Sequence, residues 1–421
     1  MKPQTTAKLL VLTTALSIGS TADADVVTEW NTAALNAIRA GRTPPPKASR
    51  ALAILHASIY DAVNGISRTH EAYLVQSAVP ASASKEAAVS AAAHEVLVTL
   101  FPTNAPSFDE FHATILAAIA NGPQKSSGIA WGESVARQIL ASRANDSSEA
   151  VLSPPSGSGP GAWQPTPPAF VAYLLPQWGF VTPFAIATSS QFRPPGPPTL
   201  DGAGYLRDYN EVKALGAAAG AARTPDQDLI ALFWADGAGT ETPPGHWNSI
   251  AQEVGAALRN TMEQNARLFA LLNIAMADAA ICAWDAKYTS NFWRPVTAIR
   301  NGDTDGVAAT VGDPTWSSFI VTPPFPDYVS GHSAFSGAAS MVLALFYGTD
   351  EIAFTTGSDF LPGVTRHFTS FSAAASEAAI SRLYGGIHFR SANEDGLTSG
   401  RGIGEWTFTR YMLPKGNRSR K

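Results

Sequence analysis

Three short stretches near the C-terminal end of the chain carry residues suited to binding a tetrahedral oxyanion. The first contains two cations, Lys287 and Arg294. The second is the triplet Ser-Gly-His at 330–332, and the third contains Arg382 and His388. Fixed cations can neutralise an anion, free N–H groups at a helix start can donate to it, and histidines can ligate it or move protons. Together the three stretches indicate an oxyanion site.

The first stretch places two cations seven residues apart in a tract with helical periodicity. On a continuous helix Lys287 and Arg294 would share one face, and Pro295 would disturb the helix just after them. Such a pair is most often a solvated surface feature. The neighbouring Phe292 and Trp293 argue for an apolar environment instead.

The second stretch directly precedes a run of small residues at 333–345. Ser330 is placed as an N-cap, so the first-turn N–H groups and the helix dipole predict an anion site. Gly331 would let the backbone approach a ligand closely. Considered alone, the triplet is better explained by an ordinary capped helix with a structural His332.

The third stretch contains a Gly-Gly pair at 385–386 between its arginine and its histidine. If one unbroken helix contained both Arg382 and His388, which are six residues apart, their side chains would point to different faces of that helix. A turn at the two glycines would end the helix and could bring both side chains to one pocket. Structural roles for both residues are also compatible with this motif by itself.

Taken jointly, the three stretches resemble a known signature. The pattern Lys-x6-Arg-Pro, Ser-Gly-His and Ser-Arg-x5-His is similar to that shared by vanadium-dependent haloperoxidases, type 2 phosphatidic acid phosphatases and related bacterial acid phosphatases. Order and internal spacing match in all three, and the resemblance covers residues 284–395. It implies an all-α fold of helical bundles, as in the haloperoxidases and acid phosphatases.

The resemblance implies a role for each matched residue. His388 would bond vanadium, or in the phosphatase branch would be the nucleophile that becomes phosphohistidine. His332 would be the acid–base residue. The groups that bind the oxygens of vanadate or phosphate would be Lys287, Arg294, Arg382, the Ser330 hydroxyl and the Gly331 N–H.

For the haloperoxidase branch, the resemblance implies vanadate as the cofactor and hydrogen peroxide and a halide as substrates. Vanadate would act as a Lewis acid without changing oxidation state, and Lys287 would polarise the peroxide for attack by halide. The product, hypohalous acid or its equivalent, would react with a small organic acceptor. Trp284 and Phe325 stand where similar fungal chloroperoxidases carry aromatics near the halide, although core packing explains lone aromatics as well.

The chain departs from the family pattern at two positions. Val329 stands where many members have proline, and Ala392 stands where members often carry an acid that orients the last histidine. Orientation of His388 would then fall to Glu394, Asp395 or a backbone carbonyl.

Two other functions compete with haloperoxidase. The first is an exported acid phosphatase acting through a phosphohistidine at His388, and the second is a non-catalytic oxyanion-binding protein. Without residues 1–24 the chain has 421 − 24 = 397 residues, long beside the compact soluble phosphatases, so size favours the peroxidase. Two histidines placed as ligand and proton carrier favour catalysis over simple binding.

Composition bounds the remaining possibilities. A chain of 421 residues with 45% apolar and 15% charged residues can bury a sizeable core. A net charge of -5 provides no basic footprint for nucleic acid. Cys282 is the only cysteine, so stability must come from packing and not from intramolecular disulfides. An oligomer is compatible with the sequence.

The N-terminus has the pattern of an export signal. Lys2 and Lys8 precede an apolar run at 9–18, and the small residues at 22–24 offer a cleavage site. We therefore expect a signal peptide at 1–24 and a secreted or periplasmic protein. An apolar run of about ten residues is too short to span a bilayer, which takes about 20. No other apolar stretch is expected to be long and uninterrupted enough to span a bilayer, so no membrane span is expected after signal removal.

Apolar residues recur at helical spacing over most of the chain, and no period-two alternation is sustained, so a central β-sheet is not expected. Helices are predicted at 27–40, 48–63, 85–100, 108–120, 129–142, 205–222, 227–234, 248–288, 333–346, 372–383 and 393–411.

Three regions follow from this pattern. They are an N-terminal helical region at 25–150, a proline-rich packed connector at 151–200 and a C-terminal helical bundle with the oxyanion site at 201–421. His246 is predicted to lie in a rigid loop at 243–247 that could line the pocket, without an assigned role.

Overall fold

The structure, a computed structural model, describes residues 25–416 apart from 78, 154 and 156. The signal peptide predicted at 1–24 lies outside the described residues. Most of the described chain is helical, which confirms the all-α prediction. The one sheet in this part of the chain is a two-stranded antiparallel hairpin, β1 (Phe354–Gly357) with β2 (Thr365–Phe368).

The predicted N-terminal helices all form. Their ends follow local chemistry: the Asp25 side chain accepts from the N–H groups of Val27 and Thr28, and Ser84 caps the third helix. Prolines at the start of the second helix occupy its first turn, where a missing N–H is tolerated. The helices are α1 (Val26–Gly41), α2 (Pro45–Ser67), α3 (Lys85–Leu100), α4 (Ala105–Ala118) and α5 (Pro123–Arg143), with a 3-10 turn η1 (Pro102–Asn104).

The C-terminal half supplies the helices that carry the predicted site. They are α6 (Ala203–Leu215), α7 (Pro225–Phe233), α8 (Thr242–Ala257), α9 (Met262–Ser290), α10 (Pro295–Arg300), α11 (Gly331–Tyr347), α12 (Phe371–Tyr384) and α13 (Arg390–Arg410), with a 3-10 turn η3 (Gly302–Thr304).

Three boundaries in this half were predicted wrongly. Helix α6 ends at Leu215 and not at 222. The tract 248–288 is two helices, because a capping box of Thr261 and Gln264 starts α9 afresh after α8 has ended. The apolar periodicity continues through the break and hides it. Helix α8 also begins earlier than predicted, so His246 lies within a helix and not in a loop.

Helix α9 also corrects the expectation about membrane spans. It is long and apolar enough to cross a bilayer, and its most apolar 18-residue window is 94% buried inside the protein. A core helix covered on all sides has the same composition as a membrane span. Here α9 is the central helix of the bundle, packed against α2, α11 and α13.

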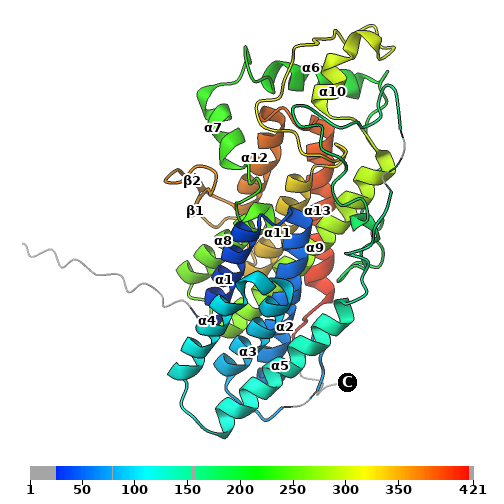
Figure 1. Cartoon of the computed structure of the whole chain (residues 1–421). Helices are drawn as coiled ribbons and strands as arrows, with labels where there is room; N and C mark the ends of the chain where they lie inside the picture. Colours follow the sequence, from blue (N-terminus) through cyan, green and yellow to red (C-terminus); the bar gives the residue numbers. More distant parts are fainter. Residues whose placement is uncertain (1–24, 78, 154, 156, 417–421) are drawn as a thin grey trace, which may run out of the picture.

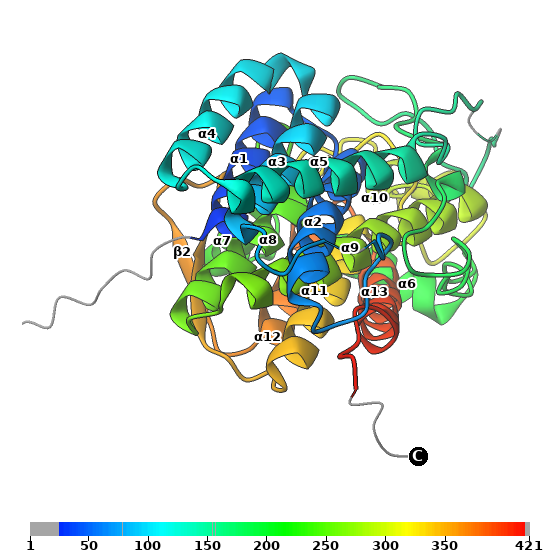
Figure 2. The same cartoon turned by 90° about the horizontal axis from the view of Figure 1, so that it is seen from below.

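Helices α9, α11 and α13 run side by side, and α1 to α5 cover one side of them (Figure 1 and Figure 2). The close contact between α11 and α13 depends on glycine. A Cβ added at Gly337 would overlap the Leu397 carbonyl, and one at Gly400 would overlap the Ala334 carbonyl. This contact fixes α11, whose first turn carries the Ser-Gly-His triplet.

The connector at 151–200 is irregular in its described residues apart from the 3-10 turn η2 (Trp178–Phe180), and parts of it pack on the body. Trp163 and Trp178 are buried within it. Asp278 of α9 accepts hydrogen bonds from three successive N–H groups of the connector at 184–186. Burial raises the pKa of Asp278 to about 6, although these three bonds favour its charged form.

Candidate active site

The two cations of the first stretch meet in space, but not by the predicted route. Helix α9 ends at Ser290, and Asn291 adopts a left-handed conformation with φ 45°. Arg294 therefore lies beyond the helix, extended at the start of α10, and shares no helix face with Lys287. The turn nevertheless places both cations beside the aromatic ring of Phe325. Lys287 Nζ lies 4.8 Å, and Arg294 Cζ 4.9 Å, from the centroid of Phe325.

Lys287 is completely buried at the end of α9. Its Nζ donates to the carbonyl oxygens of Pro326 at 2.9 Å and Asp327 at 3.1 Å. Burial, together with the nearby charge of Arg294, holds the pKa of Lys287 well below its usual range. An anion bound beside this group would reverse the effect and favour the charged ammonium.

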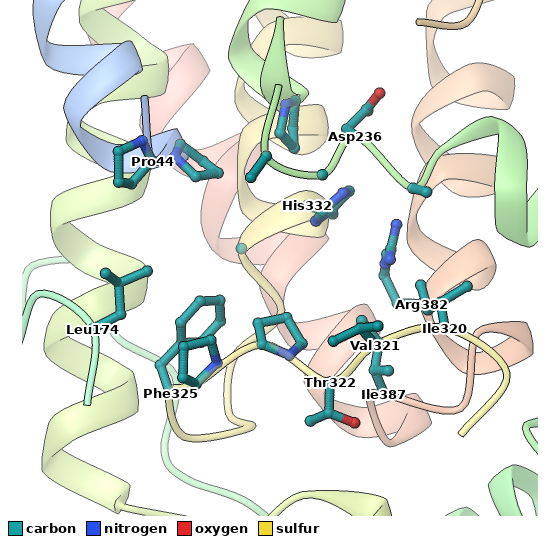
Figure 3. Close-up of a pocket in the computed structure, with 18 of the residues that line it drawn as sticks. Pro44, Leu174, Asp236, Ile320, Val321, Thr322, Phe325, His332, Arg382 and Ile387 are labelled. Atoms are coloured by element: carbon teal, nitrogen blue, oxygen red, sulfur yellow. The ribbon is translucent and has the colours of Figure 1, made fainter. Parts of the chain in front are cut away.

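The triplet at 330–332 forms the predicted helix start. The Ser330 side chain accepts from the Ser333 N–H at 3.4 Å, so Ser330 is the N-cap of α11. Gly331 packs on Trp284, and a Cβ there would lie 3.3 Å from the indole. His332 follows in the first turn and points into a pocket toward Arg382 (Figure 3).

The Gly-Gly turn also forms as predicted. Helix α12 ends at Tyr384, and Gly386 has φ 75° and lies so close to Gly216 that no Cβ would fit. Through this turn Arg382 and His388 both reach the pocket. Burial lowers the pKa of Arg382 to about 10, and one of its terminal N–H groups donates to the Trp234 carbonyl.

The carboxylate partner of His388 is Asp327, a residue that the sequence reasoning missed. Asp327 Oδ1 lies 2.9 Å from His388 Nδ1. The predicted candidates are engaged elsewhere, since Asp395 accepts from Tyr328 Oη and Glu394 pairs with Arg390. Burial raises the pKa of Asp327 to about 7, and burial plus the charge of Arg294 holds the pKa of His388 well below its usual range.

These residues surround one pocket of about 420 Å³. Its lining brings together most of the predicted site residues, namely Trp284, Phe325, Gly331, His332, Arg382 and His388. Lys287, Arg294 and Ser330 are fully buried just behind this wall. Arg294 Nη1, for example, lies 3.0 Å from His388 Nε2. The rings of Trp284 and Phe325 are in contact, with centroids 4.9 Å apart and their planes tilted by 50°.

The donors around the pocket fit an oxyanion. Arg294 Nη2, Arg382 Nε and His332 Nε2 are all buried without a hydrogen-bond partner among the described residues. Unpaired buried donors are costly, and oxygens of a bound anion would satisfy all three. The same part of the chain holds no group of three or more His, Cys, Asp or Glu that could cage a metal cation. The site therefore suits vanadate or phosphate held through one histidine.

A second buried pair, Asp236 and His246, borders the site and was also missed. Asp236 follows α7, lines the pocket near Arg382 and His332 (Figure 3), and pairs with His246 Nδ1 at 3.3 Å. The His246 ring stacks on Trp234. Burial opposes the charged imidazolium, but the Asp236 carboxylate outweighs it and raises the pKa of His246.

We expect His246→Gln to destabilise the protein, because it leaves the buried Asp236 carboxylate without a cation. Breaking a buried pair in this way typically costs about 3–5 kcal/mol. Folding raises the pKa of His246. The pair therefore contributes fully to stability when the pH is below the pKa of His246 in the unfolded chain, and this contribution is lost as the pH rises through the pKa in the folded protein. Urea unfolding at about pH 6 and about pH 9, on either side of the usual imidazole range, should show the larger loss at the lower pH. The exposed His367→Gln is the control, and an equal loss at both pH values would contradict the charged pair.

Comparisons with known proteins agree on one class. A family model described as the VCPO second helical-bundle domain matches residues 267–414, which include all three motif stretches. The vanadium chloroperoxidase of Curvularia inaequalis is 26% identical, with 83% of this chain and 74% of that protein aligned.

Solved structures give the same result. The first bacterial vanadium-dependent iodoperoxidase superimposes with a TM-score of 0.81 at 28% identity, covering 93% of this chain and 97% of that one. An apo-type bacterial vanadium-dependent chloroperoxidase shares the fold at a TM-score of 0.68 and 18% identity, over 86% of this chain and 92% of that one. The helical-bundle fold is thus shared. The chain is similar to vanadium-dependent haloperoxidases in sequence and in fold.

The pairing of His388 with Asp327 leads to a mutational prediction. Asp327→Asn should weaken vanadate binding by about 10–100-fold, the usual cost of losing a group that orients a metal-binding histidine. Titration calorimetry with orthovanadate measures this directly. Asp395→Asn is the matched control, since Asp395 contacts Tyr328 and not His388. Unchanged affinity in Asp327→Asn would show that the carboxylate does not orient the ring.

Proposed function

We propose that this protein is a vanadate-dependent peroxidase that oxidises a halide with hydrogen peroxide to a hypohalous acid equivalent. Similarity to vanadium-dependent haloperoxidases supports the enzyme class and the cofactor. The observation that carries the site assignment is the set of three buried, unpaired donors, on Arg294, Arg382 and His332, around the pocket that His388 lines.

In this proposal His388 holds vanadate through Nε2. Asp327 Oδ1 lies 2.9 Å from Nδ1, so a carboxylate is close enough to hold an N–H at that nitrogen, which would leave the lone pair of Nε2 for the metal. Arg294 and Arg382, each at most 1% exposed, supply permanent positive charge for the oxygens. Bound vanadate would supply Lewis-acid activation of hydrogen peroxide without a change of oxidation state.

In this proposal His332 would transfer a proton, and Lys287 would attract negative charge. Burial and the nearby Arg382 hold the pKa of His332 well below its usual range, so in the empty site the ring is neutral and can accept a proton. A bound anion would raise this pKa and prepare the ring to donate. Lys287, buried beside Phe325 and Trp284, would place an ammonium at the edge of an apolar space where its field is strong.

The apolar surroundings of the site favour halide oxidation over phosphoester hydrolysis. Trp284 and Phe325 flank the cations and are almost completely buried. A weakly hydrated halide loses little by entering such a space, whereas a large polar phosphoester would lose hydration without new partners.

The phosphatase alternative is supported by the His388–Asp327 pair, which could also serve a histidine nucleophile. We therefore expect vanadate-free protein to hydrolyse a phosphomonoester slowly, because His388 is then free, and added vanadate to suppress this activity. The vanadate-loaded protein should brominate or iodinate a phenolic dye with peroxide.

The assay compares iodide, bromide and chloride with vanadate and peroxide against p-nitrophenyl phosphate without vanadate. Halide-dependent dye halogenation supports the proposal. Fast hydrolysis with no halogenation under any halide would move the protein to the phosphatases. Tight vanadate binding with no turnover in either assay would leave a non-catalytic oxyanion-binding protein.

We also propose export of the chain to the periplasm or the medium, on the basis of the signal pattern at 1–24. Cleavage after Ala24 would keep the Asp25 cap of α1 and its contact with Asn265 at 2.8 Å. N-terminal sequencing of protein from the exported fraction should begin at Asp25. Full-length chain retained in the cytoplasm would contradict this.

A further inference from the structure

The pocket over the oxyanion site is larger than its small substrates require. A water molecule occupies about 30 Å³ of liquid, and halide and peroxide are of comparable size. The pocket measures about 420 Å³, within the range typical of sites for small organic molecules. Most of its volume is therefore available to a further ligand.

The walls of this space are apolar and rigid. Seven prolines line it, on four separate segments: Pro44, Pro45, Pro167, Pro168, Pro243, Pro323 and Pro324. At its rim the apolar side chains of Val171, Val321 and Phe360 are 53%, 76% and 46% exposed. Covering these side chains with an apolar ligand would be favourable by the hydrophobic effect.

Few charges are left in this space to attract a charged ligand. Arg382, His332 and His388 belong to the oxyanion site, and Figure 3 shows His332 and Arg382 close together in the pocket. The Asp236 carboxylate is already paired with the buried His246. Arg42 is the remaining charged residue of the lining. The ligand that fits best is therefore neutral.

Few side chains of the lining are of the kinds that react most readily with the expected product. None of the described residues that line the pocket is cysteine, methionine or tyrosine, and sulfur side chains are the first targets of oxidants. Trp284 and the two histidines at the oxyanion site are the readily oxidised side chains of the lining. About half of the lining is proline, valine, isoleucine and threonine, which do not react readily with hypohalous acid. A wall of this kind suits a space in which an oxidised halogen meets its acceptor.

We propose that the pocket binds a neutral, apolar aromatic acceptor and that halogen is transferred to it there, before release of free hypohalous acid. This inference rests on the proposed haloperoxidase function. Halide loses two electrons to hydrogen peroxide, whose O–O bond breaks, and one proton is consumed to form hypohalous acid and water. A π-electron pair of the acceptor then forms the carbon–halogen bond as the oxygen–halogen bond breaks. The ring proton leaves with the hydroxide as water.

The test is a competition between two acceptors, 2-naphthol and the charged 4-hydroxybenzenesulfonate. Vanadate-loaded protein, peroxide and bromide are compared with chemically added hypobromous acid at the same pH. The proposal expects the ratio of brominated 2-naphthol to brominated sulfonate to be at least about tenfold higher with the protein, a difference of roughly 1.4 kcal/mol in selectivity. An identical ratio for protein and free reagent would overturn it.

A matched pair of variants locates the effect. Val321→Lys puts a charge on the pocket rim and should bring the product ratio toward that of the free reagent. Val311→Lys, at a similarly exposed valine that does not line the pocket, should leave the ratio unchanged. Equal ratios in both variants would overturn the assignment of the site to this pocket.

A binding measurement separates the inference from the proposed function. Calorimetry of 2-naphthol with vanadate-free protein needs no turnover, and saturable binding that weakens in Val321→Lys but not in Val311→Lys is expected. Absence of such binding would overturn the acceptor site. Absence of any bromination would overturn the haloperoxidase function, whereas bromination with the selectivity of free reagent would overturn only the acceptor site.

Discussion

His388→Ala is expected to abolish tight vanadate binding and, with it, halide-dependent turnover. Of the two histidines that line the pocket among the described residues, His388 is the one with a carboxylate beside its ring. Its Nδ1 atom lies 2.9 Å from Asp327 Oδ1. Without the ring, Lys287, Arg294 and Arg382 would still attract an oxyanion, but no side chain would bond the metal. Residual binding should then resemble that of phosphate.

Calorimetry with orthovanadate and with phosphate, on wild type and variant, measures this change. His367→Ala is the control, because His367 is an exposed histidine on β2, away from the pocket lining. Equal vanadate affinity in wild type and His388→Ala would remove His388 from the metal site. Retained phosphate binding in the variant would show that its fold and its cations are intact.

His332→Ala is expected to keep vanadate and lose turnover. The ring lies in the first turn of α11, and its Nε2 is buried without a partner among the described residues, so it is free to exchange a proton with a ligand. Loss of a positioned acid–base group typically lowers a rate by about 10²–10⁴-fold. Removal of one donor should weaken vanadate binding far less than His388→Ala does.

The measurement pairs kcat with the vanadate dissociation constant for each variant. His332→Gln keeps a hydrogen-bond donor but carries no titratable proton, so it should bind like wild type and turn over like His332→Ala. An active His332→Gln would show that the residue serves only to hold the anion.

The sequence predicted the parts of this protein that depend on local chemistry. Ser330 as an N-cap and the turn at Gly385 and Gly386 follow from the preferences of single residues, and both form as expected. The long helices around them follow from apolar periodicity. Most of the predicted residues that line the candidate site could therefore be found from the sequence alone.

The parts that were missed depend on contacts between distant segments. Asp327 and His388 lie on different elements, and no spacing rule connects them, although Asp327 opens the second motif stretch. The same holds for Asp236 and His246, whose pairing requires the loop after α7 to fold over α8. The prediction that Lys287 and Arg294 lie close together is correct, but the predicted reason, a shared helix face, is wrong. The left-handed Asn291 ends the helix between them.

The central claim is that vanadate is held by His388 among the cations of this pocket, and a crystal structure of vanadate-soaked protein tests it most directly. Anomalous scattering identifies vanadium independently of the protein density. We predict one vanadium peak bonded to His388 Nε2, with its oxygens in contact with the donors that are now unpaired, Arg294 Nη2 and Arg382 Nε. A pocket without vanadium under conditions in which the enzyme turns over, or vanadium bound away from His388, would contradict the account.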